Sequence, residues 1–223
     1  MEKLHEHGFP VPQRLADAAD HVRLIGSTST PPESPLPGDP DFARKLDKYV
    51  TAHAKWLAER EAYAAMLDDA KRVLTQISVE SFDEVLGHVR PAFTDAAREW
   101  TESHRELDGV TSLSEAASAD IDGTAVRAWH RRTAAAKRLT SLVDVLKRML
   151  DPLVPGGWRS EQTACLITEV PAGFGGVLAS DIRGSSAPDG QRRYVALADH
   201  GFPLSLVDSL DDYLARLDTM SGE

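Results

Sequence analysis

Apolar positions between Pro40 and about Ile77 recur at alternating spacings of four and three residues. This repeat places one continuous stripe along a helix and favours packing against a second long helix. Asp39 can cap the first turn. The members of the stripe are Phe42, Leu46, Tyr49, Trp56, Tyr63, Leu67, Ala70, Leu74 and Ile77, with His53 and Arg60 at the two polar seam positions. We therefore predict one long helix that needs a long partner.

Two further stretches carry the same helical spacing. The first begins near Ser81, where Ser81 and Glu84 match a capping box, and Pro91 should kink or divide it. The second runs from about Thr124 to Leu150. Together with the first long helix they predict an elongated three-helix bundle or coiled-coil hairpin over residues 39–153.

Residues 154–223 contain shorter apolar runs that end at glycine-rich or proline-rich turns. Runs of this length and composition are typical of strands. The three predicted strands are Thr163–Val170, Gly176–Ile182 and Arg193–Ala198, and a helix is expected from about Leu204. We therefore predict a small antiparallel sheet with one C-terminal helix over it.

Residues 1–38 are predicted to be a short helix followed by a tether. The segment 26–38 is rich in Pro, Ser, Thr and Gly and has little to bury. The expected fold class is thus mainly α with a small α+β module at the C-terminus.

The composition of the chain argues against membrane-spanning, secreted and metal-binding proteins. The chain has a net charge of −10, and no apolar run approaches the roughly 18 residues of a membrane span. The N-terminus lacks the hydrophobic segment of a secretory signal, so we expect a cytoplasmic location. The single Cys165 lies in an apolar run and is expected to be a small core residue. We predict neither a metal site nor a cofactor.

One basic stretch stands out from the acidic background. Residues 125–150 contain seven basic residues and one acidic residue. Arg127, Arg131 and Arg138 share one side of the predicted helix and could bind phosphates or other anions. The other interpretation is a face that is paired with acidic residues of neighbouring helices.

The tetrapeptide His7–Pro10 recurs as His200–Pro203. Phe9 and Phe202 could each fill a pocket in a docking element, and in a symmetric dimer each copy could meet an equivalent site. The alternative is coincidence, because Gly-Pro segments at helix entries are common.

Catalytic motifs are absent from the sequence: there is no Gly-x-Ser-x-Gly and no Gly-rich loop with Lys. Asp181, Arg183, Asp199 and His200 lie near predicted strand ends and could converge in a shallow site. Acid–base chemistry there would require one of the carboxylates within hydrogen-bond reach of His200.

The sequence therefore favours a non-enzymatic interaction protein over an enzyme. We expect a scaffold subunit of a bacterial or phage-type assembly, acting through its long helices by self-association or with a protein partner. Trp56, Tyr63 and Trp100 are the expected interface aromatics, because such residues are enriched at hot spots. The alternative is a regulator that responds to nucleic acid or another anion through Arg127, Arg131 and Arg138.

Overall fold

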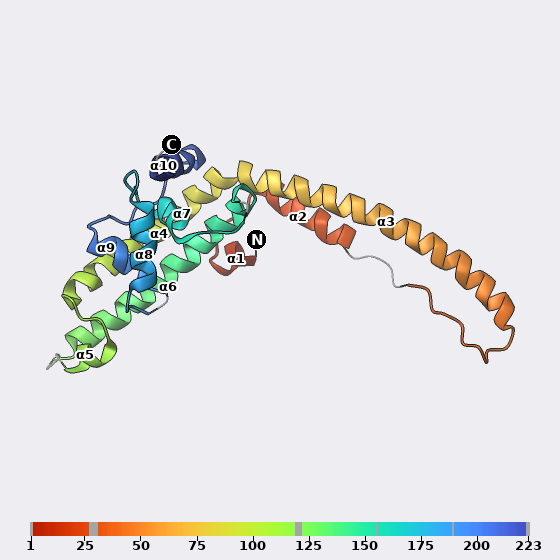
Figure 1. Cartoon of the computed structure of the whole chain (residues 1–223), viewed down its shortest axis with the longest axis horizontal. Helices are drawn as coiled ribbons and strands as arrows, with labels where there is room; N and C mark the ends of the chain where they lie inside the picture. The colour runs from red at the N-terminus through yellow and green to blue at the C-terminus, as the bar shows by residue number, and fades with distance from the viewer. Residues whose placement is uncertain (1, 27–30, 119–121, 155, 189, 222–223) are drawn as a thin grey trace. The chain divides into compact units, whose positions relative to one another are not determined.

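The structure of the chain, a computed structural model, describes residues 2–26, 31–118, 122–154, 156–188 and 190–221. The elements within these ranges are all helical, and no strand occurs in them (Figure 1). In chain order they are α1 (Glu2–Glu6), α2 (Gln13–Gly26), α3 (Phe42–Glu80), α4 (Phe82–Leu107), α5 (Leu113–Ser118), α6 (Thr124–Leu150), the 3₁₀ turn η1 (Asp151–Leu153), α7 (Ser160–Ile167), α8 (Gly175–Gly184), α9 (Arg192–Asp199) and α10 (Leu210–Ser221).

The predicted C-terminal sheet is wrong, because α7, α8 and α9 occupy the three predicted strands. Apolar runs this short do not distinguish a strand from a buried helical turn. Burial in α8 follows helical spacing, at Gly175, Leu178, Ala179 and Ile182. The mainly helical class itself is confirmed.

The last helix begins at Leu210 and not near Leu204. The segment before it is held to the end of α7. Ser205 N–H donates to the carbonyl of Ile167 at 2.8 Å, and Val207 N–H donates to that of Leu166 at 3.0 Å. These bonds satisfy carbonyls that the end of a helix leaves free, and they keep residues 205–207 out of a helix of their own.

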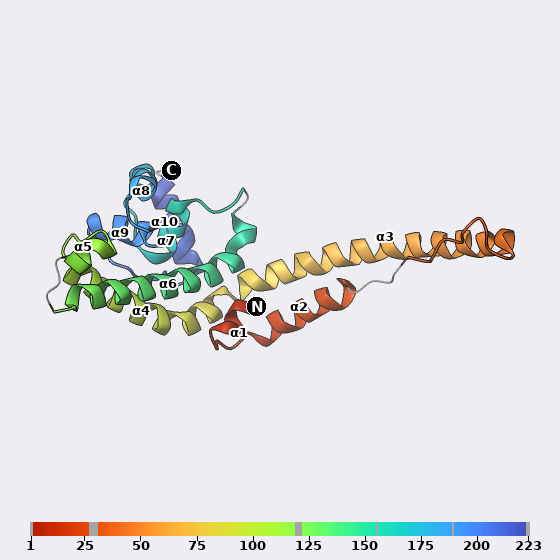
Figure 2. The same cartoon turned by 90° about the horizontal axis from the view of Figure 1, so that it is seen from below.

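The chain forms two compact units, residues 1–11 with 80–223 and residues 12–79. In the first unit, α4 and α6 lie side by side along their lengths, as Figures 1 and 2 show. The helix α3 belongs to the second unit with α2. The prediction of one bundle containing all three long helices is corrected accordingly: within the first unit the long helices form a pair.

The α4–α6 pair carries the core of the first unit. Its buried side chains recur every three or four residues on both helices, as two amphipathic helices require. On α4 they include Phe82, Val85, Leu86, Val89, Phe93, Ala96, Ala97, Trp100 and Leu107, and on α6 Ala135, Ala136, Leu139, Leu142, Val143, Leu146, Met149 and Leu150. Pro91 lies inside α4, which continues through it.

Polar contacts hold the short C-terminal helices against this pair. Tyr194 Oη of α9 lies 3.1 Å from Thr140 Oγ1 of α6. Arg90 of α4 donates to the carboxylate of Asp208 at 2.7 Å and to the carbonyl of Val207 at 2.9 Å. The C-terminal segment thus packs as part of one unit with the long helices.

The repeated tetrapeptide has the same structural role at both of its occurrences. In the first copy, Gly8 follows α1 with a φ of 69°. The N–H of Gly8 donates to the carbonyl of His5 and the N–H of Phe9 to that of Leu4, both at 2.9 Å. These two bonds define a Schellman motif, which closes the C-terminus of a helix.

The second copy closes α9 in the same way. Gly201 has a φ of 74°, its N–H donates to the carbonyl of Ala198, and the N–H of Phe202 donates to that of Leu197, again at 2.9 Å. The histidine and phenylalanine rings of each copy also face each other, at 5.8 Å in the first and 6.0 Å in the second. The repeat is therefore a helix stop: glycine supplies the left-handed residue and proline prevents continuation.

Alanine at Gly201 should destabilise the protein by about 1–2 kcal/mol, because an L-residue is strained at positive φ. Gly87 provides the matched control, since it lies inside α4 at negative φ and nothing lies within 4 Å of an added Cβ at either position. Gly87→Ala should therefore stabilise by about 0.5–1 kcal/mol. Urea unfolding of both variants measures the two effects; equal signs would contradict the assigned role of Gly201.

Candidate functional site

In the second unit, few side chains of the long helix α3 are buried by other parts of that unit. In Figures 1 and 2, α2 and the segment 31–41 run alongside α3 in the opposite direction. Only Ala70 is buried among the residues of α3, and most other members of the predicted stripe are half-buried. The stripe thus finds partial cover within its own unit.

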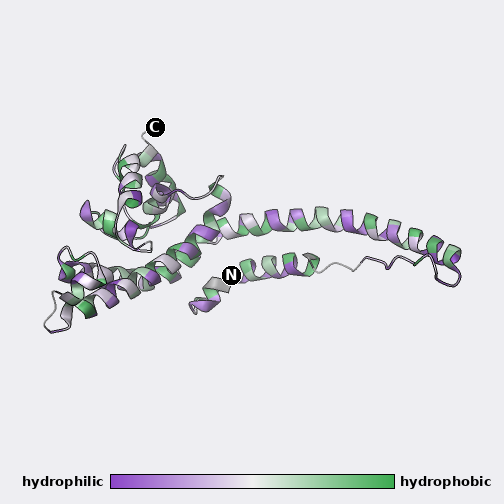
Figure 3. Cartoon of the chain, turned by 60° about the horizontal axis from the view of Figure 1, so that its bottom comes forward, coloured by the Kyte–Doolittle hydropathy of each residue, from purple (hydrophilic) through white to green (hydrophobic). Residues whose placement is uncertain are grey.

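Large apolar side chains stay exposed along α3, and Figure 3 shows apolar positions recurring over its length. Val50 is 56% exposed and Met66 51%. Val50 and Leu57 flank the stripe on one side, whereas Met66 and Val73 flank it on the other. The exposed apolar patch of α3 consists of Leu46, Val50, Leu57, Tyr63, Met66 and Val73.

The predicted interface aromatics fall into different environments. Tyr63 lies in this exposed patch. Trp56 is half-buried, with the guanidinium of Arg60 5.3 Å from its ring centroid. Trp100 is 1% exposed in the core of the first unit and is not an interface residue on its surface. The structure therefore separates Trp100 from the other two, because α6 covers the stripe of α4, whereas the stripe of α3 is only partly covered within its own unit.

Phe9 and Phe202 are half-buried beside the helix stops that contain them. The ring of Phe202 packs edge-on against Phe174, with centroids 5.3 Å apart. The local packing of both rings accompanies a Schellman motif, in which an apolar residue after the glycine commonly contacts the last turn.

The predicted basic face of α6 is largely paired. Arg131 forms an ion pair with Glu106, and Arg138 forms one with Glu99, both on α4. Arg127 hydrogen-bonds the carbonyl of Asp122 and the hydroxyl of Thr124. Such exposed pairs contribute about 0–1 kcal/mol each, but they reduce the net charge that this face presents.

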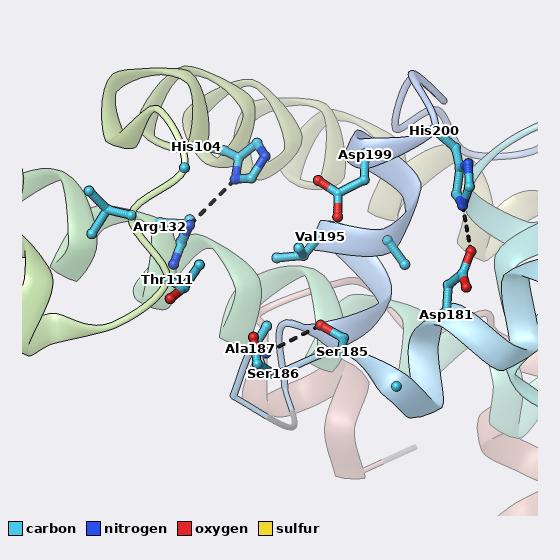
Figure 4. A pocket seen from close by; sticks show the side chains of 14 residues that line it. His104, Thr111, Arg132, Asp181, Ser185, Ser186, Ala187, Val195, Asp199 and His200 are labelled. Carbon is cyan, nitrogen blue, oxygen red and sulfur yellow. Dashed lines mark hydrogen bonds and ion pairs between the residues drawn. The ribbon is translucent and has the colours of Figure 1, made fainter.

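The first unit also contains a cavity of about 580 Å³ that is lined by residues of α4, α6, α8 and α9 and of the loops beside them (Figure 4). Asp181, Asp199 and His200 line it, whereas Arg183 is not among its lining residues. Nε2 of His200 lies 2.7 Å from Oδ2 of Asp181. The structure thus brings together three of the four residues that the sequence analysis singled out.

At the other end of the cavity, the buried guanidinium of Arg132 lies beside the imidazole of His104. Arg132 is 3% exposed, and its guanidinium lies 4.5 Å from the centroid of the Trp129 ring. Its Nη1 is 3.4 Å from Nδ1 of His104, and its Nε has no hydrogen-bond partner among the residues that the structure describes. The ring of His104 stacks on Trp100, with centroids 4.7 Å apart. Figure 4 shows Arg132 and His104 well apart from Asp181 and His200, and Asp199 lies between these two groups.

Burial and charge both act on these groups. Burial lowers the pKa of His104, the positive charge of Arg132 lowers it further, and Asp199 partly offsets the shift. The neutral imidazole is therefore favoured at pH 7. Burial also lowers the pKa of Arg132, but a guanidinium stays charged in proteins.

The sequence also indicates that Arg132 is unusual, although Arg132 is not part of the predicted basic face of Arg127, Arg131 and Arg138. Arg132 lies four residues after Ala128 and three before Ala135, on the buried side of α6. A charged residue on the apolar stripe of a helix is unusual and indicates a specific partner or site. Arg127, Arg131 and Arg138 share a different, exposed side of α6.

The arrangement in the cavity does not resemble a nucleophilic active site. Among the described residues, no hydroxyl or thiol hydrogen-bonds to His200, whose contacts are Asp181 and the rings of Phe174 and Phe202. A histidine–carboxylate pair without a nucleophile orients an imidazole but offers no group for covalent catalysis.

None of the helices that the structure describes is both long enough and apolar enough to cross a lipid bilayer. Comparisons with protein-family models, with curated proteins and with solved structures found no match for this chain.

Proposed function

We propose that this chain is a cytoplasmic, non-enzymatic interaction or scaffold protein that self-associates by antiparallel pairing of α3. The exposed apolar patch of α3 supports this proposal, since monomeric proteins rarely leave a long series of apolar side chains uncovered on one element. A second copy of the chain is the partner that the sequence of α3 fits best.

The charge of α3 is unevenly distributed and favours antiparallel pairing. Residues 42–60 contain five basic and two acidic residues, whereas residues 61–80 contain four acidic and two basic residues. Basic residues near the start of a helix oppose its dipole, so the helix by itself does not account for this order. Two antiparallel copies would place each basic half beside an acidic half.

The stripe also has a register in which it complements itself. An antiparallel pair centred between Arg60 and Tyr63 would place His53 opposite the small Ala70 and Trp56 opposite Leu67. The guanidinium of Arg60 would meet the Tyr63 ring of the second copy, a favourable cation–π arrangement. Each polar seam position would thus face a residue that can accommodate it, which is how polar seam residues specify register.

Sedimentation of the full chain tests the proposal directly. We expect a dimer at micromolar concentration, and Leu57→Glu with Tyr63→Glu should weaken it by at least about 100-fold, because two charges would enter an apolar seam. Ala58→Glu is the matched control: Ala58 is exposed and points away from the seam, so this variant should remain dimeric. A wild-type monomer at all concentrations would refute the proposal.

Cross-linking distinguishes the two possible orientations. The register places residue 46 of one copy opposite residue 77 of the other. An oxidised mixture of Leu46→Cys and Ile77→Cys proteins should form cross-linked heterodimers, and neither variant should cross-link alone. Cross-linked homodimers of either variant would indicate parallel pairing.

The alternative, an anion- or nucleic-acid-responsive regulator, receives less support. Arg131 and Arg138 are engaged by carboxylates of α4, and the net charge of −10 disfavours a polyanion. No observation on the basic face of α6 points to a ligand.

A further inference from the structure

The cavity of the first unit contains a buried positive charge with no described carboxylate to balance it. Burying a cation without a counter-charge is unfavourable, and proteins normally pair such groups. The described residues provide Arg132 with only an imidazole nitrogen at 3.4 Å and the ring of Trp129. None of those residues accepts a hydrogen bond from its Nε–H.

A second buried arginine of the same unit shows the usual solution. Arg216 is 9% exposed, and its guanidinium pairs with the carboxylate of Asp212 at 2.9 Å. The fold thus neutralises one buried arginine with an acidic side chain four residues away. No carboxylate among the described residues pairs with Arg132 in this way, and Arg132 lines the cavity of about 580 Å³. Its missing counter-charge points to a ligand.

The opposite part of the cavity is acidic. Asp181 is held by His200, whereas Asp199 makes no ion pair or side-chain hydrogen bond with the residues that the structure describes. A simple anion at Arg132 would therefore face two carboxylates across the cavity. A ligand with an anionic group at one end and a cationic group at the other would satisfy both ends.

Size and lining agree with a small ligand of this kind. A volume of about 580 Å³ lies in the range of small-molecule pockets, roughly 300–1,000 Å³. Ser185 and Ser186 line the cavity and offer hydroxyl groups, and Val195 and Ala196 provide an apolar wall. Polar groups at the ends and apolar residues between them suit a short aliphatic chain.

We propose that this cavity binds a small zwitterion, with its carboxylate on the guanidinium of Arg132 and its ammonium group on Asp199. The lining of the cavity contains no residue of α3, so occupancy of the cavity and pairing of α3 can be measured independently. The ligand class follows from the two ends alone: a planar guanidinium matches a carboxylate, and an unpaired aspartate matches an ammonium ion.

Calorimetric titration of the full chain with a series of ω-amino acids tests the proposal. Glycine, β-alanine, 4-aminobutyrate and 6-aminohexanoate carry the same two charges at increasing separation, and acetate carries the anion alone. We expect one member of the series to bind at least about tenfold more tightly than acetate, because only it reaches both ends. Equal affinity for acetate and every zwitterion, or no saturable binding by any of them, would overturn the proposal.

Variants of Arg132 and Asp199 test which residue binds each charged end of the ligand. Arg132→Met keeps an unbranched side chain against Trp129 and should abolish binding of the preferred ligand, whereas Arg131→Met, at the exposed neighbouring position, should leave it unchanged. Asp199→Asn should reduce affinity to that of acetate, and because Asp199 is exposed this variant should fold normally. Unchanged binding in Asp199→Asn, or equal losses in the two arginine variants, would refute the assignment even if Arg132→Met were unstable.

Discussion

Replacing Trp100 with alanine should lower the free energy of unfolding of the unit formed by residues 1–11 and 80–223 by about 3–5 kcal/mol. The side chain is 1% exposed and is among the largest that this unit buries. Its ring stacks on His104 and lies 5.9 Å from the ring of Tyr194, so it joins α4 to α9. Its removal would leave a cavity at this junction, which surrounding side chains would fill only in part.

Trp56→Ala is the control for this prediction. Trp56 lies on α3 in the other unit and is half-buried, so its removal costs less transfer free energy and leaves no closed cavity. We expect urea unfolding monitored by circular dichroism to show a large loss for Trp100→Ala and a small one for Trp56→Ala. Trp56→Ala should instead weaken association. Similar stability losses in the two variants would contradict the burial that separates them.

Cys165 in the folded protein should react with iodoacetamide at least about a thousandfold more slowly than in denaturant, because reaction requires an opening of the unit. The thiol is fully buried on α7, and its Sγ lies 3.5 Å from Sδ of Met220. Burial raises the pKa of the Cys165 thiol to about 11, so little thiolate exists at pH 8. Since the thiolate is the reactive form, both burial and protonation protect this residue.

Ser180→Cys provides an accessible thiol for comparison, because Ser180 is exposed on α8 of the same unit. It should react at the rate of a free cysteine while Cys165 remains protected. In the Trp100→Ala protein the labelling of Cys165 should accelerate by about 10²–10⁴, because a loss of 3–5 kcal/mol raises the open fraction by that factor. Rapid labelling of Cys165 in the intact wild-type protein would show that α7 is not part of the packed core.

The long helices could be predicted because their periodicity is sustained. The predicted helix from Pro40 to about Ile77 corresponds to α3, Phe42–Glu80, and the predicted Thr124–Leu150 coincides with α6. Over such lengths a strand pattern cannot reproduce the spacing of apolar residues. What covers each stripe could not be predicted, because the stripes of α3 and α4 look alike in sequence while only that of α4 is buried.

The short elements and the cavity depended on contacts across the chain. The composition of Thr163–Val170 predicts a strand, yet α7 forms there. The backbone N–H groups of Ser205 and Val207 donate hydrogen bonds to the free carbonyls at its end. Asp181 and His200 lie near predicted strand ends, and the sequence leaves open whether they meet. The structure brings them together at the ends of α8 and α9, two helices that the sequence pattern does not predict.

The amino-acid sequence by itself determined the helical character of the long stretches and the uneven charge of α3, because the first follows from the spacing of apolar residues and the second from composition. Only the tertiary structure decided that Trp100 is core, that Arg131 and Arg138 are paired, and that Arg132 lies buried beside a cavity with no counter-charge from the described residues. The physical reason is that burial and electrostatic balance depend on neighbours distant in sequence, and local patterns carry no information about which neighbours those are.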